Sequence, residues 1–248
     1  MAKKVKNMAA KKFDLEKHLA EEHHDLGRGT KLRDAILGGQ DGLVNVLGVI
    51  LGVAAATYET RIVIIAGLAA TFAESISMAA VAYTSTKAEE DFYRSQYEKE
   101  KAEVEKGSPT EVEEVREIYR RNGFGGKMLE AIVKKITSDK KVWLDFMMHE
   151  ELGLDKPQGG AFNSALLVGV AALIGSVIPL AAFFFLPVTQ AIYSSLVLSA
   201  LVLFAAGVVK ARLTTGKWWK SGLELMMIGM ISAIVGYAVG ALLGVAIA

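Results

Sequence analysis

Five long apolar segments constrain the fold of this chain more than any other feature of its sequence. They cover about residues 35–57, 61–83, 161–186, 188–209 and 221–247 of the 248 residues. A helix of ~20 apolar residues crosses the ~30 Å hydrocarbon core of a bilayer. The segments are continuous apolar runs without period-two alternation, which favours helices over a β-barrel. The predicted fold is therefore all-α: a polytopic membrane protein with five transmembrane helices and a helical insert between spans two and three.

The distribution of Lys and Arg predicts the orientation. Basic residues are concentrated in 1–34, 84–160 and 210–220, whereas the turns at 58–60 and 186–187 contain none. Loops rich in Lys and Arg remain on the cytoplasmic side of a membrane. We therefore expect the N-terminus and the insert to be cytoplasmic. The charged first 30 residues lack the apolar core of a cleavable signal peptide.

The predicted organisation follows from these segments. Residues 1–34 form a cytoplasmic amphipathic segment, 35–83 form transmembrane helices 1 and 2, 84–160 form the insert, and 161–248 form transmembrane helices 3–5. Residues that favour helices, separated by Gly and Pro, predict four helices in the insert at about 87–106, 108–121, 126–137 and 140–152. The N-terminal His18, Glu22, His23 and His24 form either a metal-binding group or part of a surface helix.

Carboxylates recur at helical spacing in the insert. Glu100 and Glu103 are three residues apart, and Glu111 and Glu114 repeat this spacing on the next predicted helix. On the last helix, Glu151 follows the thioether of Met147 after four residues. If the first two helices form a hairpin, four carboxylates converge, and oxygen ligands suit hard or borderline divalent cations. The alternative is an ordinary solvated face of acidic helices.

Two acids interrupt the first two apolar segments. Asp41 lies in the first and Glu74 in the second. A charge near the bilayer centre costs roughly 2.5–3.5 kcal/mol, so such residues point to an ion or proton pathway. Asn45 and Met78 each follow one of these acids by four residues and share its helix face.

Each of these residues also has a structural interpretation. Asp41 could be a structural acid bonded to Asn45, which could itself simply bridge helices, and Met78 could be ordinary packing. The glycines around Asp41, which are Gly38, Gly39 and Gly42, either allow close helix packing or leave backbone room for an ion.

Two segments resemble the membrane signatures of the vacuolar iron transporter family. Residues 32–44, LRDAILGGQDGLV, are similar to its first-span signature, and residues 74–83, ESISMAAVAY, to its second. The five-span layout with a helical insert also matches, so the resemblance covers the chain from about residue 18. It implies a homodimeric exporter of ferrous iron from the cytoplasm, driven by proton antiport.

The resemblance also implies roles for the residues singled out above. Asp41 and Met78 would line the transport path. From their own chemistry, Glu74 could relay protons and Asn45 could add a carbonyl ligand to this path. The insert would collect metal through Glu100, Glu103, Glu111, Glu114, Met147 and Glu151. Fe²⁺ would be the substrate, with no prosthetic group, and the partners would be divalent ions, protons, membrane lipid and a second copy of the chain. No nucleic acid partner is expected.

Other functions remain open at this point. Mn²⁺, Zn²⁺ or Co²⁺ would use similar ligands, because affinity order alone does not decide selectivity. The insert could also be a membrane-held metal sensor or store without transport. An enzyme is not expected, since the spans have no Ser/His or paired-Asp constellation and no His-Glu-x-x-His motif. The membrane would be the plasma membrane in a prokaryote or the vacuolar membrane in a eukaryote.

Overall fold

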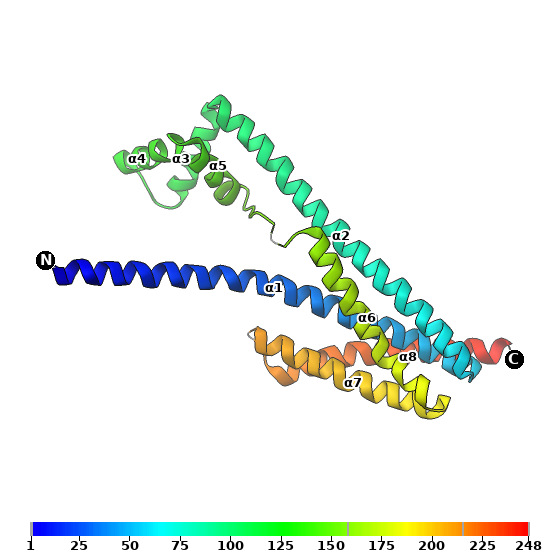
Figure 1. Cartoon of the computed structure of the whole chain (residues 1–248). Coiled ribbons are helices and arrows are strands. Elements are labelled where there is room, and N and C mark those ends of the chain that lie inside the picture. Colours follow the sequence, from blue (N-terminus) through cyan, green and yellow to red (C-terminus); the bar gives the residue numbers. More distant parts are fainter. Residues whose placement is uncertain (1, 158, 215, 248) are drawn as a thin grey trace. The chain divides into compact units, whose positions relative to one another are not determined.

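The computed structural model describes residues 2–157, 159–214 and 216–247, and side chains between residues 29 and 244 of these ranges. In the described residues every regular element is helical, and no strand occurs. The elements are α1 (Ala2–Thr57), α2 (Thr60–Lys106), α3 (Pro109–Arg121), α4 (Gly126–Thr137), α5 (Lys140–Phe146), the π-helical η1 (Met147–Glu151), α6 (Ala161–Phe185), α7 (Val188–Leu213) and α8 (Trp218–Ile247) (Figure 1). The side chains of His18, Glu22, His23 and His24, in the predicted amphipathic segment, lie outside the described residues.

Five helices are long and apolar enough to cross a membrane. They are residues Gly29–Thr57 of α1, α2, α6, α7, and residues Trp218–Gly244 of α8. This confirms the predicted all-α fold with five candidate membrane spans. Span two and the helix expected at 87–106 are continuous and form a single helix, α2. The residues between them, Thr84 to Thr86, favour helices only weakly, but no Gly or Pro interrupts the helix there.

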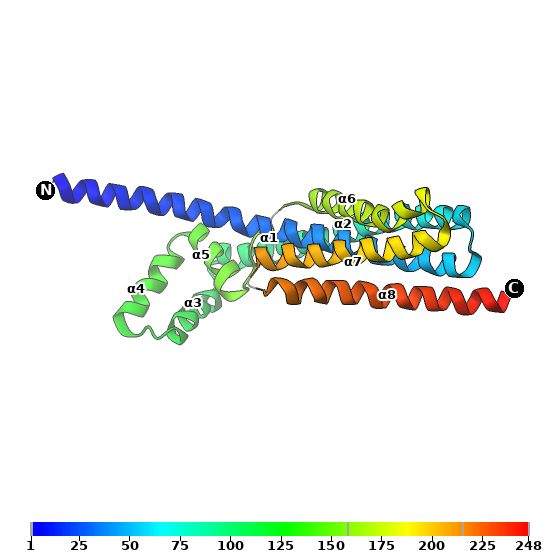
Figure 2. The same ribbon diagram turned by 90° about the horizontal axis from the view of Figure 1, so that it is seen from below.

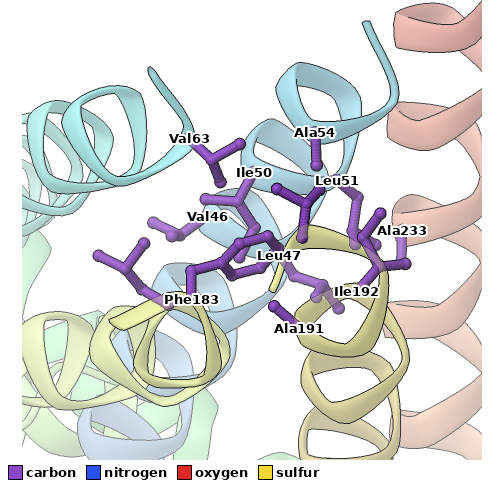
Figure 3. Packing of buried hydrophobic residues seen from close by; sticks show 12 residues of the cluster. Val46, Leu47, Ile50, Leu51, Ala54, Val63, Phe183, Ala191, Ile192 and Ala233 are labelled. Carbon is purple, nitrogen blue, oxygen red and sulfur yellow. The ribbon is translucent and has the colours of Figure 1, made fainter. Parts of the chain in front are cut away.

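The chain divides into two compact units, one formed by residues 1–83 with 161–248 and the other by Thr84–Gly160. In the first unit, α1 lies at the centre of the packing and contacts α6 and α8 most extensively. Leu47, Ile50 and Leu51 of α1 point into a core that Phe183 of α6 and Ile192 of α7 complete (Figure 3). Figure 2 shows α7 and α8 running side by side along this unit.

Glycines set how closely α1 approaches its neighbours. A Cβ added at Gly38 would lie closer than 3.0 Å to the backbone carbonyl of Val168 in α6. On the other side, a Cβ at Gly240 of α8 would meet the carbonyl of Gly52 equally closely. Small residues allow helix backbones to approach in this way. The glycines before Asp41 therefore serve close packing, the first of the two roles considered for them.

The second unit has its own core. Residues from α2, α3, α4, α5 and η1 contribute to it: Val104, Val115, Leu129, Val133, Ile136, Trp143 and Met147. The ring of Tyr119 packs against Phe146, with ring centroids 5.5 Å apart, and against Phe124. Gly107 and Gly123 end α2 and α3 with positive φ angles of 66° and 89°, which glycine adopts without steric cost. The first turn brings α3 back against α2, and the second brings α4 back against α3.

Candidate functional site

The two acids of the predicted membrane path lie together. The side chain of Asp41 on α1 hydrogen-bonds to that of Glu74 on α2, and Asn45 also hydrogen-bonds to Asp41. Two ionised carboxylates repel each other, so a hydrogen bond between them requires that one carries a proton. Met78 follows Glu74 by one helical turn and is half-buried. The structure thus brings Asp41, Asn45 and Glu74 into one group and places Met78 on the same face of α2.

This group borders a face of α1 that the other described helices cover only in part. Leu37, Asp41, Asn45 and Val49 recur every four residues and share that face. The side chains of Leu37 and Val49 are 52% and 41% exposed, and Asn45 is exposed as well. We call these four residues the open face of α1. Asn45 has Asp41 as its hydrogen-bond partner, but exposed polar side chains are unfavourable in hydrocarbon, so the open face is unusual for a membrane span.

The acids of the insert form two groups that share one residue. Oxygens of Glu100, Glu103 and Glu111 all lie within 4.8 Å of one another, and so do oxygens of Glu111, Glu114 and Glu151. The structure therefore brings together all five glutamates that the sequence analysis singled out. Because Glu111 belongs to both groups, two cations could share its carboxylate.

Two of these carboxylates are buried without full hydrogen bonding. Glu100 is 3% exposed and Glu111 is 5% exposed. In each, the atom Oε2 has no hydrogen-bond partner in the described part of the chain. Lys99 provides the nearest described positive charge, with its Nζ atom 4.0 Å from Oε1 of Glu100. Buried carboxylate oxygens without partners are costly, and a bound divalent cation would remove this cost.

The same crowding changes the acidity of the cluster. Burial, a hydrogen bond with Glu103 and the charges of Glu114 and Glu100 raise the pKa of Glu111 to about 8. Burial of its carboxyl end and the charges of Glu114 and Glu100 raise the pKa of Glu151 to about 7, although the residue as a whole is exposed. Protons therefore occupy this cluster near neutral pH, and a cation that binds must displace them.

Met147 lies in the core of the insert. Its side chain is fully buried and packs in the cluster that includes Val104 and Val115. The single helix predicted over 140–152 is wrong in its second half, because α5 ends at Phe146 and η1 follows. The backbone N–H of Leu152 donates to the carbonyl of Met147, a wider turn than in an α-helix. Such π-helical turns occur frequently at functional sites, and this one carries both Met147 and Glu151.

The sequence profile of the VIT family matches residues 32–241, which include both membrane acids and the whole insert. The chain belongs to the VIT family. Vacuolar iron transporter 1 of Eucalyptus grandis is 33% identical over 222 residues, which cover 88% of this chain and 89% of that protein. Vacuolar iron transporter 1 of Arabidopsis thaliana is 34% identical over 218 residues, 87% of this chain and 86% of the relative. The vacuolar iron transporter of Plasmodium berghei is 29% identical over 251 residues, 97% of this chain and 91% of the relative.

With five apolar helices and these relatives, this VIT family chain is a multi-pass integral membrane protein.

The sequence analysis missed one buried acid at the start of its first span, Asp34. This residue is 4% exposed, accepts a hydrogen bond of 2.6 Å from the hydroxyl of Ser164 in α6, and pairs with Arg33. Asp34 precedes Gly38 by four residues and so shares the face of α1 that packs on α6. This spacing of four residues between Asp34 and Gly38 was the sequence feature that could have predicted a buried position for Asp34.

Proposed function

We propose that this chain exports ferrous iron, or a similar divalent cation, from the cytoplasm across a membrane in exchange for protons. The hydrogen-bonded pair of Asp41 and Glu74, from two consecutive spans, carries the proposal. Acids inside membrane spans mark ion and proton pathways. The relatives named vacuolar iron transporters support iron as the substrate.

The pair suits an exchange of cations for protons. Without metal, a proton between Asp41 and Glu74 relieves the repulsion of their charges. A divalent cation that binds both carboxylates relieves the same repulsion and displaces that proton. Cation and proton therefore compete for one place. The thioether of Met78, one turn beyond Glu74, adds a softer ligand that favours a transition metal over Mg²⁺ or Ca²⁺.

A second copy of the chain completes this path in our proposal. The open face of α1 carries Asp41 and Asn45; Asp41 is half-buried beside Glu74, whereas Leu37, Asn45 and Val49 stay exposed in the described part of the chain. A two-fold partner that packs its own open face here would remove the polar groups from lipid. The transport path would then lie at the interface of the homodimer, between two sets of Asp41 and Glu74.

The insert collects the metal in this proposal. Its five glutamates offer two groups of oxygen ligands joined at Glu111, and two of the buried oxygens have no described partner. Met147 on η1 would add a sulfur ligand once its side chain turns toward the glutamates. Cations held there raise the local concentration of substrate at the cytoplasmic side of the membrane.

The test is Fe²⁺ uptake into proteoliposomes that contain the full chain and have an acidic interior. We expect uptake that depends on the pH gradient and that Asp41→Ala reduces at least about tenfold. The control is Glu224→Gln, which removes an exposed carboxylate of α8 outside the site and should leave uptake unchanged. If folded wild-type protein binds Fe²⁺ without transporting it, the chain is a membrane-held sensor or store instead.

A further inference from the structure

A cavity of about 340 Å³ lies between α1, α7 and α8, and no residue of the proposed path or of the insert lines it. It is found in the half of these spans that is next to the α1–α2 and α6–α7 turns, because its lining includes Tyr58 and Thr189 at those turns. Its volume is within the range of sites that bind small organic ligands. The described residues that line it include no charged side chain.

The cavity has an apolar end and a polar end. Leu51, Leu196 and Ala233 form the apolar end, and Figure 3 shows Leu51 and Ala233 close together where α1, α7 and α8 meet. Tyr58 and Thr189, whose side chains carry hydroxyls, line the other end. Seven residues separate Leu51 from Tyr58, and seven separate Thr189 from Leu196, so the two ends are ~10 Å apart along the helices. The polar end coincides with the ends of the spans and therefore with the membrane interface.

The cavity opens sideways from the bundle. Tyr193 of α7 and Tyr237 of α8 line it and are 66% and 39% exposed, on helices that cross the membrane. Molecules of the bilayer therefore reach its opening directly. Tyrosine rings combine an apolar body with a hydroxyl and favour the level of the lipid headgroups.

Tyr58 also has a φ angle of 52°, uncommon for a residue other than glycine. Such conformations persist where the surrounding structure requires them.

We propose that this cavity binds one acyl chain of a membrane phospholipid, with the ester region of the lipid against the hydroxyls of Tyr58 and Thr189. A metal ion does not fit, because no charged ligand lines the cavity. The proposed second copy of the chain packs elsewhere, on the open face of α1, whereas the cavity involves α7 and α8. A lipid matches the lateral opening, the apolar depth and the position of the polar end together.

The test uses the full chain in phosphatidylcholine vesicles that contain a phosphatidylcholine with a photoreactive diazirine on its acyl chain. After irradiation, mass spectrometry locates the labelled residues. We expect labelling near Tyr193 and Tyr237 to exceed, at least about fivefold, that at Leu201 of α7, which is 63% exposed and outside the cavity. Equal labelling at the cavity and at Leu201 would overturn the proposal.

Two variants sharpen the result. Ala233→Phe fills the apolar end and should remove the excess labelling, whereas Ile231→Phe, at a 57% exposed position of α8 outside the cavity, should leave it unchanged. Because Ala233 is fully buried and the larger ring can prevent folding, Thr189→Trp at the exposed polar end provides a second block. Excess labelling that survives in the folded blocked variants would place the lipid elsewhere and contradict the proposal.

Discussion

Glu111 has a central place among the acids of the insert, because both carboxylate groups include it. Its pKa of about 8 means that, without metal, it is largely protonated at neutral pH. A cation that binds there would therefore displace a proton. The acidity of this residue would link the metal collection that we propose to the pH of the solution around the insert.

We expect the affinity of the full-length protein for Mn²⁺ to rise between pH 6 and pH 8. Glu151 and Glu111 lose their protons over this range, with pKa values of about 7 and about 8. Each proton released on binding can contribute up to about tenfold in affinity per pH unit. Calorimetric titration in two buffers with different ionisation enthalpies measures both the affinity and the released protons. An affinity that does not change with pH would argue against this cluster as the metal site.

Glu111→Gln should weaken metal binding and stabilise the metal-free protein at pH 8. A carboxyl whose pKa is raised on folding binds its proton more tightly in the folded state. The metal-free protein therefore loses stability as the pH rises from about 4.5 to about 8. Removing the charge should restore on the order of 1 kcal/mol at pH 8. Thermal unfolding at pH 5.5 and pH 8 measures this.

The matched control is Glu113→Gln, an exposed residue two positions along the same helix, which pairs with Arg116 outside the cluster. It should leave both the metal affinity and the pH dependence of unfolding close to wild type. If the two variants behave alike, general surface charge rather than the buried cluster determines the stability.

At the scale of the elements, the faces of α1 differ in what they pack against. One face packs on α6 through Gly38 and the buried Asp34, and another packs on α8 through Gly52. The open face carries Asp41, and we propose that a second copy of the chain packs on it. The polar residue and the glycines are thus parts of one arrangement, in which close backbone contacts fix the position of the acid.

Gly240→Ala should destabilise the membrane unit. Its Cβ would lie closer than 3.0 Å to the backbone carbonyl of Gly52, which cannot turn away as a side chain can. Overpacking of this kind costs about 1–3 kcal/mol. Thermal unfolding in detergent measures the loss. Gly29→Ala is the control: nothing lies within 4 Å of its Cβ, and replacing a helical glycine should be neutral or slightly stabilising.

The elements differ in how far the sequence could predict them. The spans were predictable because long apolar runs have few alternatives in a membrane, and the helices of the insert because Gly107 and Gly123 mark their ends. The π-helical turn at Met147 was not predictable from the sequence, because it depends on how η1 packs in the core of the insert. The sequence also could not predict that Asp41 and Glu74 lie close together, because this depends on how α2 packs against α1, which no local sequence pattern specifies.

At the scale of the whole molecule, the homodimer can be tested because the sequence contains no cysteine. Asn45→Cys places one thiol on the open face of each copy, and we expect a mild oxidant to join two chains there. A disulfide forms only when the two Cα atoms come within about 7 Å, so this reports a close approach. Electrophoresis without reductant measures the linked dimer.

Leu201→Cys serves as the control, at a 63% exposed position of α7 away from the open face. Its chains should not become linked under the same oxidation. Cross-linking of Leu201→Cys but not of Asn45→Cys would place the interface on α7 and leave the open face to another partner.

The two glycine contacts of α1 have a mechanical consequence. A helix held by backbone contacts with α6 and α8 cannot turn or slide without separating from both. In contrast, α2 meets its neighbours in the membrane unit through few close backbone approaches. If a cation passes between Asp41 and Glu74, as we propose, the two acids have to separate. We then expect α2, which carries Glu74, to move relative to α1, because close backbone contacts on two sides hold α1 and Asp41 in place.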